Sequence, residues 1–245
     1  MLKPFFTYFG GKWRAAPHYP VPTHGHIVEP FAGAAGYSLR YASRNVTLVE
    51  KNLKVAGVWR YLMSVRPSEV LSLPLVFDSV DHLSGVAEEA RWLIGFWLNK
   101  GVSAPCKTPS MWMRQKKHTG SFWGESIRTR IASQVNSIRH WRLIEGDYKD
   151  APDVPATWFI DPPYEKAGIN YPSRLQAHDY ADLAAWCRAR RGQVMVCESE
   201  GAAWLPFRFF REIKAMESLN GGKKSREVIW TNYEVMRELF SMVQE

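Results

Sequence analysis

The sequence has few cysteines and lacks the patterns that would give them a structural role. Only Cys106, Cys187 and Cys197 occur among 245 residues, and none forms a CxxC pair or lies near a histidine at metal-ligand spacing. Neither a disulfide framework nor a zinc site is therefore expected, and no metal centre is predicted.

Long apolar runs, internal repeats and low-complexity tracts are also missing. No window is long and apolar enough to span a membrane. The N-terminal segment Met1-Leu2-Lys3-Pro4-Phe5-Phe6 lacks the apolar core and cleavage site of a signal peptide. We therefore expect a cytoplasmic protein with no membrane partner. The 46% hydrophobic content is enough for a packed core.

Acidic residues are scarce relative to basic ones, with 24 Asp and Glu against 32 Lys and Arg. Between Lys107 and Arg142, eight basic residues face one acid, Glu125, so these 36 residues carry seven of the eight net positive charges. Trp112 and Trp123 lie in the same segment. Cationic side chains interleaved with flat rings suit contacts with phosphates and bases, so the segment predicts a nucleic-acid partner. A helix with a solvated basic face is the alternative.

Short apolar runs alternate with amphipathic segments near both ends of the chain. We predict strands at residues 26–31, 46–50, 142–145, 157–160 and 193–197, and helices at residues 37–43, 52–64 and 175–190. This alternation is typical of an α/β protein with a doubly wound parallel sheet. Residues 207–215 and 227–233, joined by Gly221-Gly222-Lys223-Lys224, are predicted to form a terminal β-hairpin.

Residues 65–141 interrupt the sheet pattern. Pro67 ends one helical segment, and helical patterns at residues 86–99 and 126–138 alternate with basic loops. We interpret residues 65–141 as a mainly helical insertion into a domain formed by residues 1–64 and 142–245.

A loop of small residues follows the first predicted strand, with the sequence Glu29-Pro30-Phe31-Ala32-Gly33-Ala34-Ala35-Gly36. Small residues let the backbone turn tightly and approach a ligand. Glu50 ends the next strand, fourteen residues beyond Gly36, where an acid can accept hydrogen bonds from ribose hydroxyls. The pattern indicates a nucleoside site. The missing third glycine of the dinucleotide fingerprint disfavours a pyrophosphate ligand, although a nicotinamide dinucleotide remains an alternative.

The tetrapeptide Asp161-Pro162-Pro163-Tyr164 directly follows the strand at residues 157–160. An exocyclic amine on an aromatic ring is a poor nucleophile because its lone pair is delocalised into the ring. The Asp161 carboxylate and the Pro162 carbonyl could accept its two N–H groups and localise that lone pair. Tyr164 offers a flat face for a base extruded from a duplex. A strand-to-loop turn rich in Pro and Asp is the alternative.

These motifs, in this order, resemble those of the Dam-type (alpha-class) adenine-N6-specific DNA methyltransferases. The resemblance covers almost the whole chain and includes Phe5-Phe6-Thr7-Tyr8-Phe9-Gly10-Gly11-Lys12 and Gly146-Asp147-Tyr148 besides the two motifs above. It implies a Rossmann-like, seven-stranded mixed sheet with a terminal β-hairpin and an inserted target-recognition region at residues 65–141.

The resemblance also implies a function and a set of site residues. It implies that S-adenosylmethionine is the cofactor and that the methyl acceptor is the N6 amine of a flipped adenine in double-stranded DNA. The resemblance further implies a bacterial or phage-infected cell and suggests a cognate restriction enzyme as a further partner. Asp161, Pro162 and Tyr164 are the implied catalytic residues. The expected cofactor contacts are Tyr8, Lys12, Phe31, Gly33, Gly36, Glu50, Asn52, Asp147 and Tyr148, and the expected DNA contacts are Arg114, Lys116, Lys117, Arg128 and Arg130. Ala34 and Ala35 depart from the usual glycines and fit the loop if their φ angles are negative.

Other activities remain as alternatives. Cytosine-N4 methylation uses the same amine chemistry, although serine is commoner than Asp161 at the first catalytic position. Cytosine-C5 methylation would use Pro105-Cys106, but that dipeptide lies in the basic insertion and leaves the tetrapeptide unexplained. RNA and protein-glutamine methylation usually have asparagine first. A nucleic-acid-binding module that has lost its cofactor is the non-enzymatic alternative.

Overall fold

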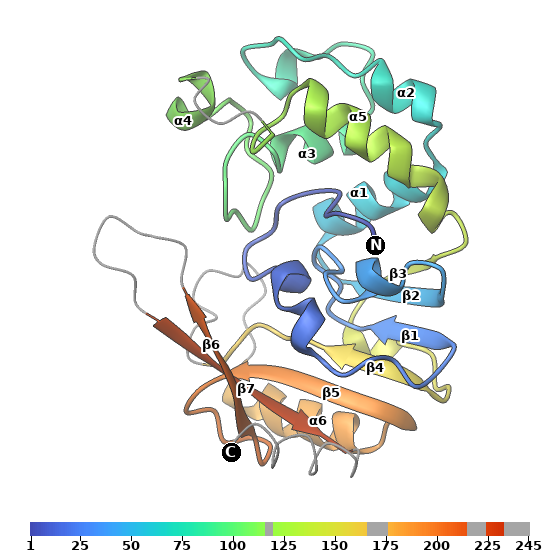
Figure 1. The fold of residues 1–245 in the computed structure, drawn as a ribbon, viewed down its shortest axis with the longest axis vertical. Helices are drawn as coiled ribbons and strands as arrows, with labels where there is room; N and C mark the ends of the chain where they lie inside the picture. The colour runs from blue at the N-terminus through green and yellow to red at the C-terminus, as the bar shows by residue number, and fades with distance from the viewer. Residues whose placement is uncertain (116–119, 166–175, 215–223, 233–245) are drawn as a thin grey trace.

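The structure, a computed structural model, describes residues 1–115, 120–165, 176–214 and 224–232. Seven strands within these ranges form one mixed sheet in the order β3-β2-β1-β4-β5-β7-β6 (Figure 1). The five parallel strands are β1 (His26–Glu29), β2 (Asn45–Glu50), β3 (Arg142–Glu145), β4 (Ala156–Ile160) and β5 (Gly192–Ser199). Strand β7 (Lys224–Thr231) is antiparallel to both β5 and β6 (Arg208–Lys214). The protein is therefore α/β.

Both faces of the inner parallel strands β1, β2, β4 and β5 are buried, whereas β3 at the edge is partly exposed, and successive residues of the inner strands pack into two different cores. Ile27 and Phe159 contribute to the larger core, whereas Val28 and Trp158 contribute to the smaller one. This alternation follows from the two-residue period of a strand. Burial on both faces explains why these strands appear as continuous apolar runs in the sequence.

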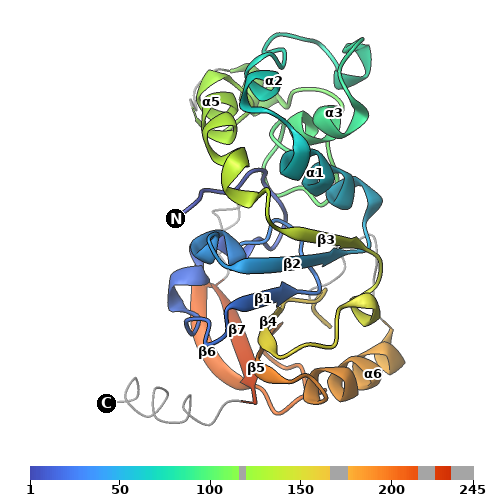
Figure 2. The ribbon, with the colours of Figure 1, turned by 90° about the vertical axis from the view of Figure 1, so that its right-hand side faces the viewer.

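Two helices lie beside the sheet and begin or end at recognisable signals. Helix α1 (Leu53–Ser64) starts at Asn52, whose side-chain oxygen accepts hydrogen bonds from the amides of Lys54 and Val55 at 3.0 and 3.4 Å. At its other end, the carbonyl of Ser64 accepts a hydrogen bond from Arg139 Nη1 at 3.1 Å. Helix α6 (Ala177–Arg188) packs against the smaller core on the β4–β5 side (Figure 2).

A group of helices lies between α1 and β3 in the sequence and beyond the β3 edge of the sheet (Figures 1 and 2). It comprises α2 (Pro67–Leu71), α3 (Glu88–Gly95), α4 (Met111–Arg114) and α5 (Glu125–Gln134). The N-terminal segment is fixed to this group because Trp97 Nε1 donates to Phe5 O at 2.8 Å and Arg130 Nη2 donates to Pro4 O at 3.2 Å. The segment that carries Tyr8 and Lys12 thus runs between the helices and the sheet.

The structure differs from the sequence predictions at several elements. Residues 38–41 form a 3₁₀ helix rather than an α-helix, since Arg40 N donates to Tyr37 O, three residues back. Helix α3 ends at Gly95 rather than near residue 99 because the amide of Cys106 occupies the Gly95 carbonyl at 3.1 Å. The helix predicted at residues 126–138 changes to 3₁₀ geometry at Val135.

The predicted β-hairpin is described only in its strands. Strands β6 and β7 pair antiparallel, and their connection at residues 215–223, which includes Gly221, Gly222 and Lys223, lies outside the described residues. Lys224, assigned to the turn from the sequence, instead begins β7. Within the described ranges, none of the helices combines the length and apolar character that crossing a bilayer needs.

Candidate functional site

A cavity of about 420 Å³ lies at the carboxyl ends of the parallel strands. The strand order reverses between β1 and β4, which lead away in opposite directions along the sheet. Such a point opens a crevice between the loops that follow the two strands, and α/β proteins bind ligands there. Segments 8–12, 29–36, 50–52 and 146–149 line the cavity, together with Asp161. The structure therefore brings together all nine residues predicted to bind the cofactor.

The loop after β1 passes very close to the N-terminal segment. A Cβ atom on Gly36 would lie 2.4 Å from Trp13 N and 2.8 Å from Lys12 C, which leaves room only for glycine. Gly33 has a φ of 45°, and its added Cβ would lie 3.2 Å from the Tyr8 ring. This close approach holds the segment with Tyr8 and Lys12 against the loop.

The expectation of negative φ angles in this loop is wrong at Ala35, which has a φ of 49°. The left-handed region costs an L-residue roughly 1–2 kcal/mol. Surrounding contacts impose the conformation, because the Ala35 amide donates to Ala32 O at 2.6 Å and its carbonyl accepts from Leu39 N at 3.1 Å. Strained backbone of this kind is concentrated at binding loops.

Glu50 connects the ends of β1 and β2. Its Oε2 accepts from Gly33 N at 2.9 Å, and its Oε1 accepts from Asn52 N at 2.8 Å. Burial raises the pKa of this carboxyl, and the backbone amides act in the opposite direction. A carboxylate has about four lone pairs, so each oxygen can still accept a further hydrogen bond from a ligand.

Asp147 and Tyr148 line the cavity, and Tyr148 lies beside Phe31 of the glycine-containing loop. The Tyr148 ring stacks on Phe31, with centroids 5.4 Å apart and an interplanar angle of 26°. Asp147 Oδ2 accepts from Lys51 Nζ at 3.0 Å, and its Oδ1 accepts from Lys149 N at 3.3 Å. A flat aromatic surface beside a carboxylate suits a heterocycle that carries hydrogen-bond donors.

Asp161 forms a buried ion pair with Lys12. Lys12 Nζ is 2.7 Å from both Asp161 oxygens and also donates to Gly10 O at 3.1 Å. The side chains are only 17% and 9% exposed. Burial raises the pKa of Asp161, while the neighbouring ammonium acts in the opposite direction. The sequence placed Lys12 beside the cofactor, whereas the structure joins it directly to the first residue of the tetrapeptide.

Tyr164 is fixed through both its ring and its hydroxyl. Lys12 Nζ lies 4.8 Å from the ring centroid, and the hydroxyl donates to Glu227 Oε1 at 3.2 Å. Tyr19 donates to the same oxygen at 2.6 Å. Burial raises the pKa of the Tyr164 hydroxyl, so it is held as a donor. Pro162 is buried beneath this loop, and neither it nor Tyr164 lines the main cavity.

Three buried acids around the site were missed in the sequence. Glu227 lies on the same face of β7 as the core residue Ile229, a period-two placement that could have indicated its burial. Glu198 on β5 accepts from the amide of Glu165 at 3.0 Å and so fixes the chain beyond Tyr164. Glu29 lines the cavity, accepts from Ser38 N at 2.7 Å, and has its pKa raised to about 8 by burial.

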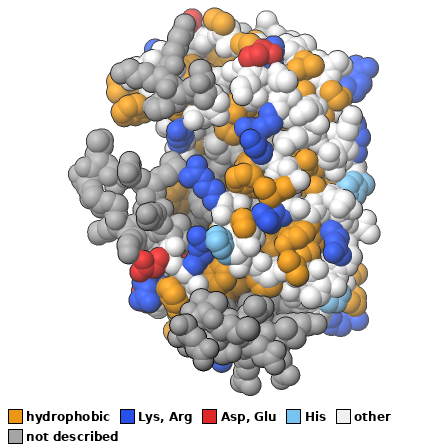
Figure 3. All heavy atoms as spheres, in the orientation of Figure 1, with side chains coloured by type: hydrophobic (Ala, Val, Ile, Leu, Met, Phe, Trp, Pro, Cys, Tyr) orange, Lys and Arg blue, Asp and Glu red, His pale blue; other side chains and the backbone are white. Residues whose placement is uncertain are grey.

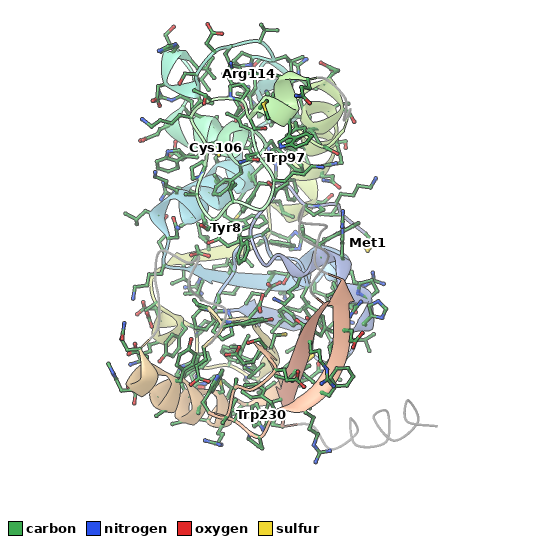
Figure 4. All side chains as sticks on the ribbon, turned by 90° about the vertical axis from the view of Figure 1, so that its left-hand side faces the viewer. Met1, Tyr8, Trp97, Cys106, Arg114 and Trp230 are labelled. Atoms are coloured by element: carbon green, nitrogen blue, oxygen red, sulfur yellow. The ribbon has the colours of Figure 1, made fainter. Side chains whose placement is uncertain are left out.

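The predicted DNA-contacting residues have different surroundings. Arg114 on α4 is exposed, and Figure 4 shows it at the end of the helical group away from Tyr8 and the sheet. Arg128 instead bonds Leu73 O at 2.7 Å and pairs with Glu125. Arg130 packs over the Trp97 ring at 5.1 Å, in addition to its bond with Pro4. Lys116 and Lys117 lie outside the described residues.

The alternative nucleophile Cys106 is poorly placed for catalysis. It is half-buried beside α3, does not line the cavity, and has its pKa raised by burial. A nucleophilic cysteine needs the opposite shift, because the thiolate is the reactive form. In the described part of the chain, no cluster of three or more His, Cys, Asp or Glu side chains could hold a metal ion.

No protein-family model matches the chain, and no curated protein matches it.

Proposed function

We propose that this protein is an S-adenosylmethionine-dependent methyltransferase that acts on the N6 amine of adenine in DNA. The observation that carries the proposal is the position of Asp161. It follows β4 at the point where the strand order reverses, and it faces the same cavity as the glycine-containing loop, Glu50 and Asp147. The first residue of the proposed amine-binding tetrapeptide and the proposed nucleoside site thus share one cavity.

The donor and acceptor groups of the cavity fit the cofactor. Glu50 retains lone pairs for ribose hydroxyls, and the stacked rings of Phe31 and Tyr148 offer an apolar surface for an adenine ring, with Asp147 beside it. S-adenosylmethionine would supply an electrophilic methyl group on a positively charged sulfur. Lys12 and Asp161 line the same cavity, and Asp161 directly follows β4.

The chain's own residues then act on the target amine. Asp161 and the Pro162 carbonyl accept its two N–H groups, which localises the nitrogen lone pair and stabilises the positive charge that develops there. Because the Asp161 side chain is only 17% exposed, little water competes for these hydrogen bonds. Asp161 orients the amine rather than deprotonating it, because a neutral aromatic amine is far too weak an acid for a carboxylate.

Surface charge supports a DNA substrate. On the face seen in Figure 3, Lys and Arg side chains clearly outnumber Asp and Glu. We propose that residues 65–141 form the target-recognition region and that Arg114 contacts DNA. Arg128 and Arg130 hold the helical group and the N-terminal segment together, so we assign them a supporting role in that region.

The proposal is tested by incubating the protein with tritium-labelled cofactor and genomic DNA, followed by sequencing that identifies modified bases. We expect label in DNA and methyl groups on adenine N6. Asp161→Ala should reduce transfer below about a tenth of the wild-type rate while cofactor affinity, measured by calorimetry, changes no more than a few-fold. Label on cytosine N4, or an Asp161→Ala variant that retains activity, would contradict the assignment.

A further inference from the structure

A second buried carboxylate lies just beyond the Lys12–Asp161 ion pair. Glu227 is 1% exposed, and its Oε1 is 3.9 Å from Lys12 Nζ. That oxygen already accepts hydrogen bonds from the Tyr19 and Tyr164 hydroxyls. Oε2 is buried and has no hydrogen-bond partner among the described residues. A buried carboxylate oxygen without a donor is unfavourable, so Glu227 has an unused capacity to accept one.

The ion pair leaves Asp161 engaged before any substrate arrives. Lys12 Nζ is at 2.7 Å from both carboxylate oxygens, the same atoms that the proposed mechanism offers to the target amine. An amine that donates to Asp161 therefore competes with the ammonium. The ammonium is 9% exposed and, once displaced, needs another negative partner, because an uncompensated buried charge is strongly unfavourable.

Apart from Asp161, Glu227 is the described carboxylate nearest to Lys12 Nζ, so it is the group that can become the new partner of the ammonium. A shift of Nζ on the order of 1 Å would bring it within hydrogen-bond distance of Glu227 Oε1, and the flexible four-carbon stem of lysine lets the ammonium also turn towards Oε2 of the same carboxylate, the oxygen without a donor. The ring of Tyr164 lies 4.8 Å from Nζ, within cation–π distance of the ammonium. Tyr19 and Tyr164 meanwhile hold Glu227 in place.

We propose that Glu227 is a positioning residue that receives the Lys12 ammonium when Asp161 binds the amine of the substrate. The proposal rests on the proposed function. It explains why β7 places an acid on the same face as its core residues, within reach of a lysine that already has a closer partner. Lys12 would thus keep a counter-ion both before and after the target base enters.

A crystal structure of the full-length Asp161→Asn variant tests the shift without substrate. Asparagine keeps the shape of Asp161 but removes the charge that holds Lys12. We expect the Lys12 Nζ to Glu227 distance to fall from 3.9 Å to about 2.8 Å, the length of a charge-assisted hydrogen bond. A lysine that remains against residue 161, more than about 3.5 Å from Glu227, would overturn the proposal.

Kinetics provide the second test. Glu227→Gln keeps a carbonyl for the two tyrosine hydroxyls and removes the charge, so we expect a single-turnover transfer rate at least about tenfold lower. Cofactor and DNA affinities should stay within about threefold, which separates this effect from a general structural loss. Glu200→Gln is the matched control, since Glu200 is an exposed acid that pairs with Arg226 away from the cavity.

The outcomes separate the two proposals. A Glu227→Gln variant with the wild-type transfer rate would overturn the positioning role even if the protein methylates DNA. Absence of transfer by the wild-type protein would contradict the proposed function, while the Asp161→Asn structure would still show whether Lys12 moves to Glu227.

Discussion

Replacing Gly36 with alanine should disrupt the cavity through the backbone of the N-terminal segment. The new Cβ would lie 2.4 Å from Trp13 N, whereas non-bonded heavy atoms prefer about 3.5–4.0 Å. The loop and the segment would therefore have to separate by about 1 Å. The same movement applied to Lys12 would stretch its 2.7 Å contact with Asp161 beyond hydrogen-bond length.

Two magnitudes follow from this displacement. Overpacking of this kind costs roughly 1–3 kcal/mol, and each kcal/mol lowers Tm by roughly 2–4 °C in a chain of this size. We therefore expect thermal unfolding of Gly36→Ala about 2–12 °C below wild type. A misplacement near 1 Å can reduce the rate of a catalysed step by about 100-fold, so single-turnover transfer should fall much more than stability suggests.

Gly25→Ala is the matched control for this experiment. No heavy atom lies within 4 Å of its added Cβ, and its φ is not positive, so Tm and transfer should both stay close to wild type. The reasoning would be refuted if Gly36→Ala unfolded within about 1 °C of wild type and retained full transfer, because the two backbones would then separate without cost.

Four further results are expected. Ala35→Gly should raise Tm by about 1–3 °C because it relieves a φ of 49°, whereas Ala34→Gly should lower it, as checked by calorimetry. Glu29 has a pKa of about 8 in the folded state, whereas the unfolded chain releases this proton above the ordinary pKa of 4.5. The free energy of unfolding should therefore fall as pH rises between these two values. Glu29→Gln should flatten that slope in thermal melts at several pH values. Arg114→Glu should reduce the slope of log affinity against log salt by roughly 0.9 for each phosphate that the protein no longer neutralises, and an unchanged slope would place the DNA elsewhere. Tyr164→Phe should keep most activity and the fluorescence rise of 2-aminopurine at the target position, while Tyr164→Ala loses at least about tenfold; equal losses would assign the role to the hydroxyl.

Periodicity and turn signals predicted the parallel strands well. Strand β3 occupies the residues expected for it, and Asn52 begins α1 as a helix-capping residue should. Both signals are local, so neighbouring residues suffice to define them. The early end of α3 at Gly95 could not be predicted because it depends on a hydrogen bond from Cys106, which is distant along the chain.

The candidate site also has a part that local sequence motifs predict and a part that depends on contacts between distant residues. The glycine-containing loop and the tetrapeptide are contiguous motifs, and the structure brings the loop and Asp161 to one cavity because the carboxyl ends of parallel strands meet at the same edge of the sheet. The pairing of Lys12 with Asp161 and the burial of Glu227 depend on how β7 and the N-terminal segment pack. For the basic residues, charge alone does not reveal that Arg128 and Arg130 form hydrogen bonds with backbone carbonyls of the protein.

The hydrogen bond from Tyr19 to Glu227 joins residues that are 208 positions apart. A growing chain emerges from the ribosome in order, and contacts of such long range close late and slowly. The hydrogen bond between the N-terminal segment and Glu227 can therefore form only after β7 has been synthesised and has paired with β5. Throughout that interval neither Tyr19 nor Lys12 has Glu227 as a partner. Completion of the cavity's polar network is thus a late event in biosynthesis, and the timing is set by the position of β7 in the sequence.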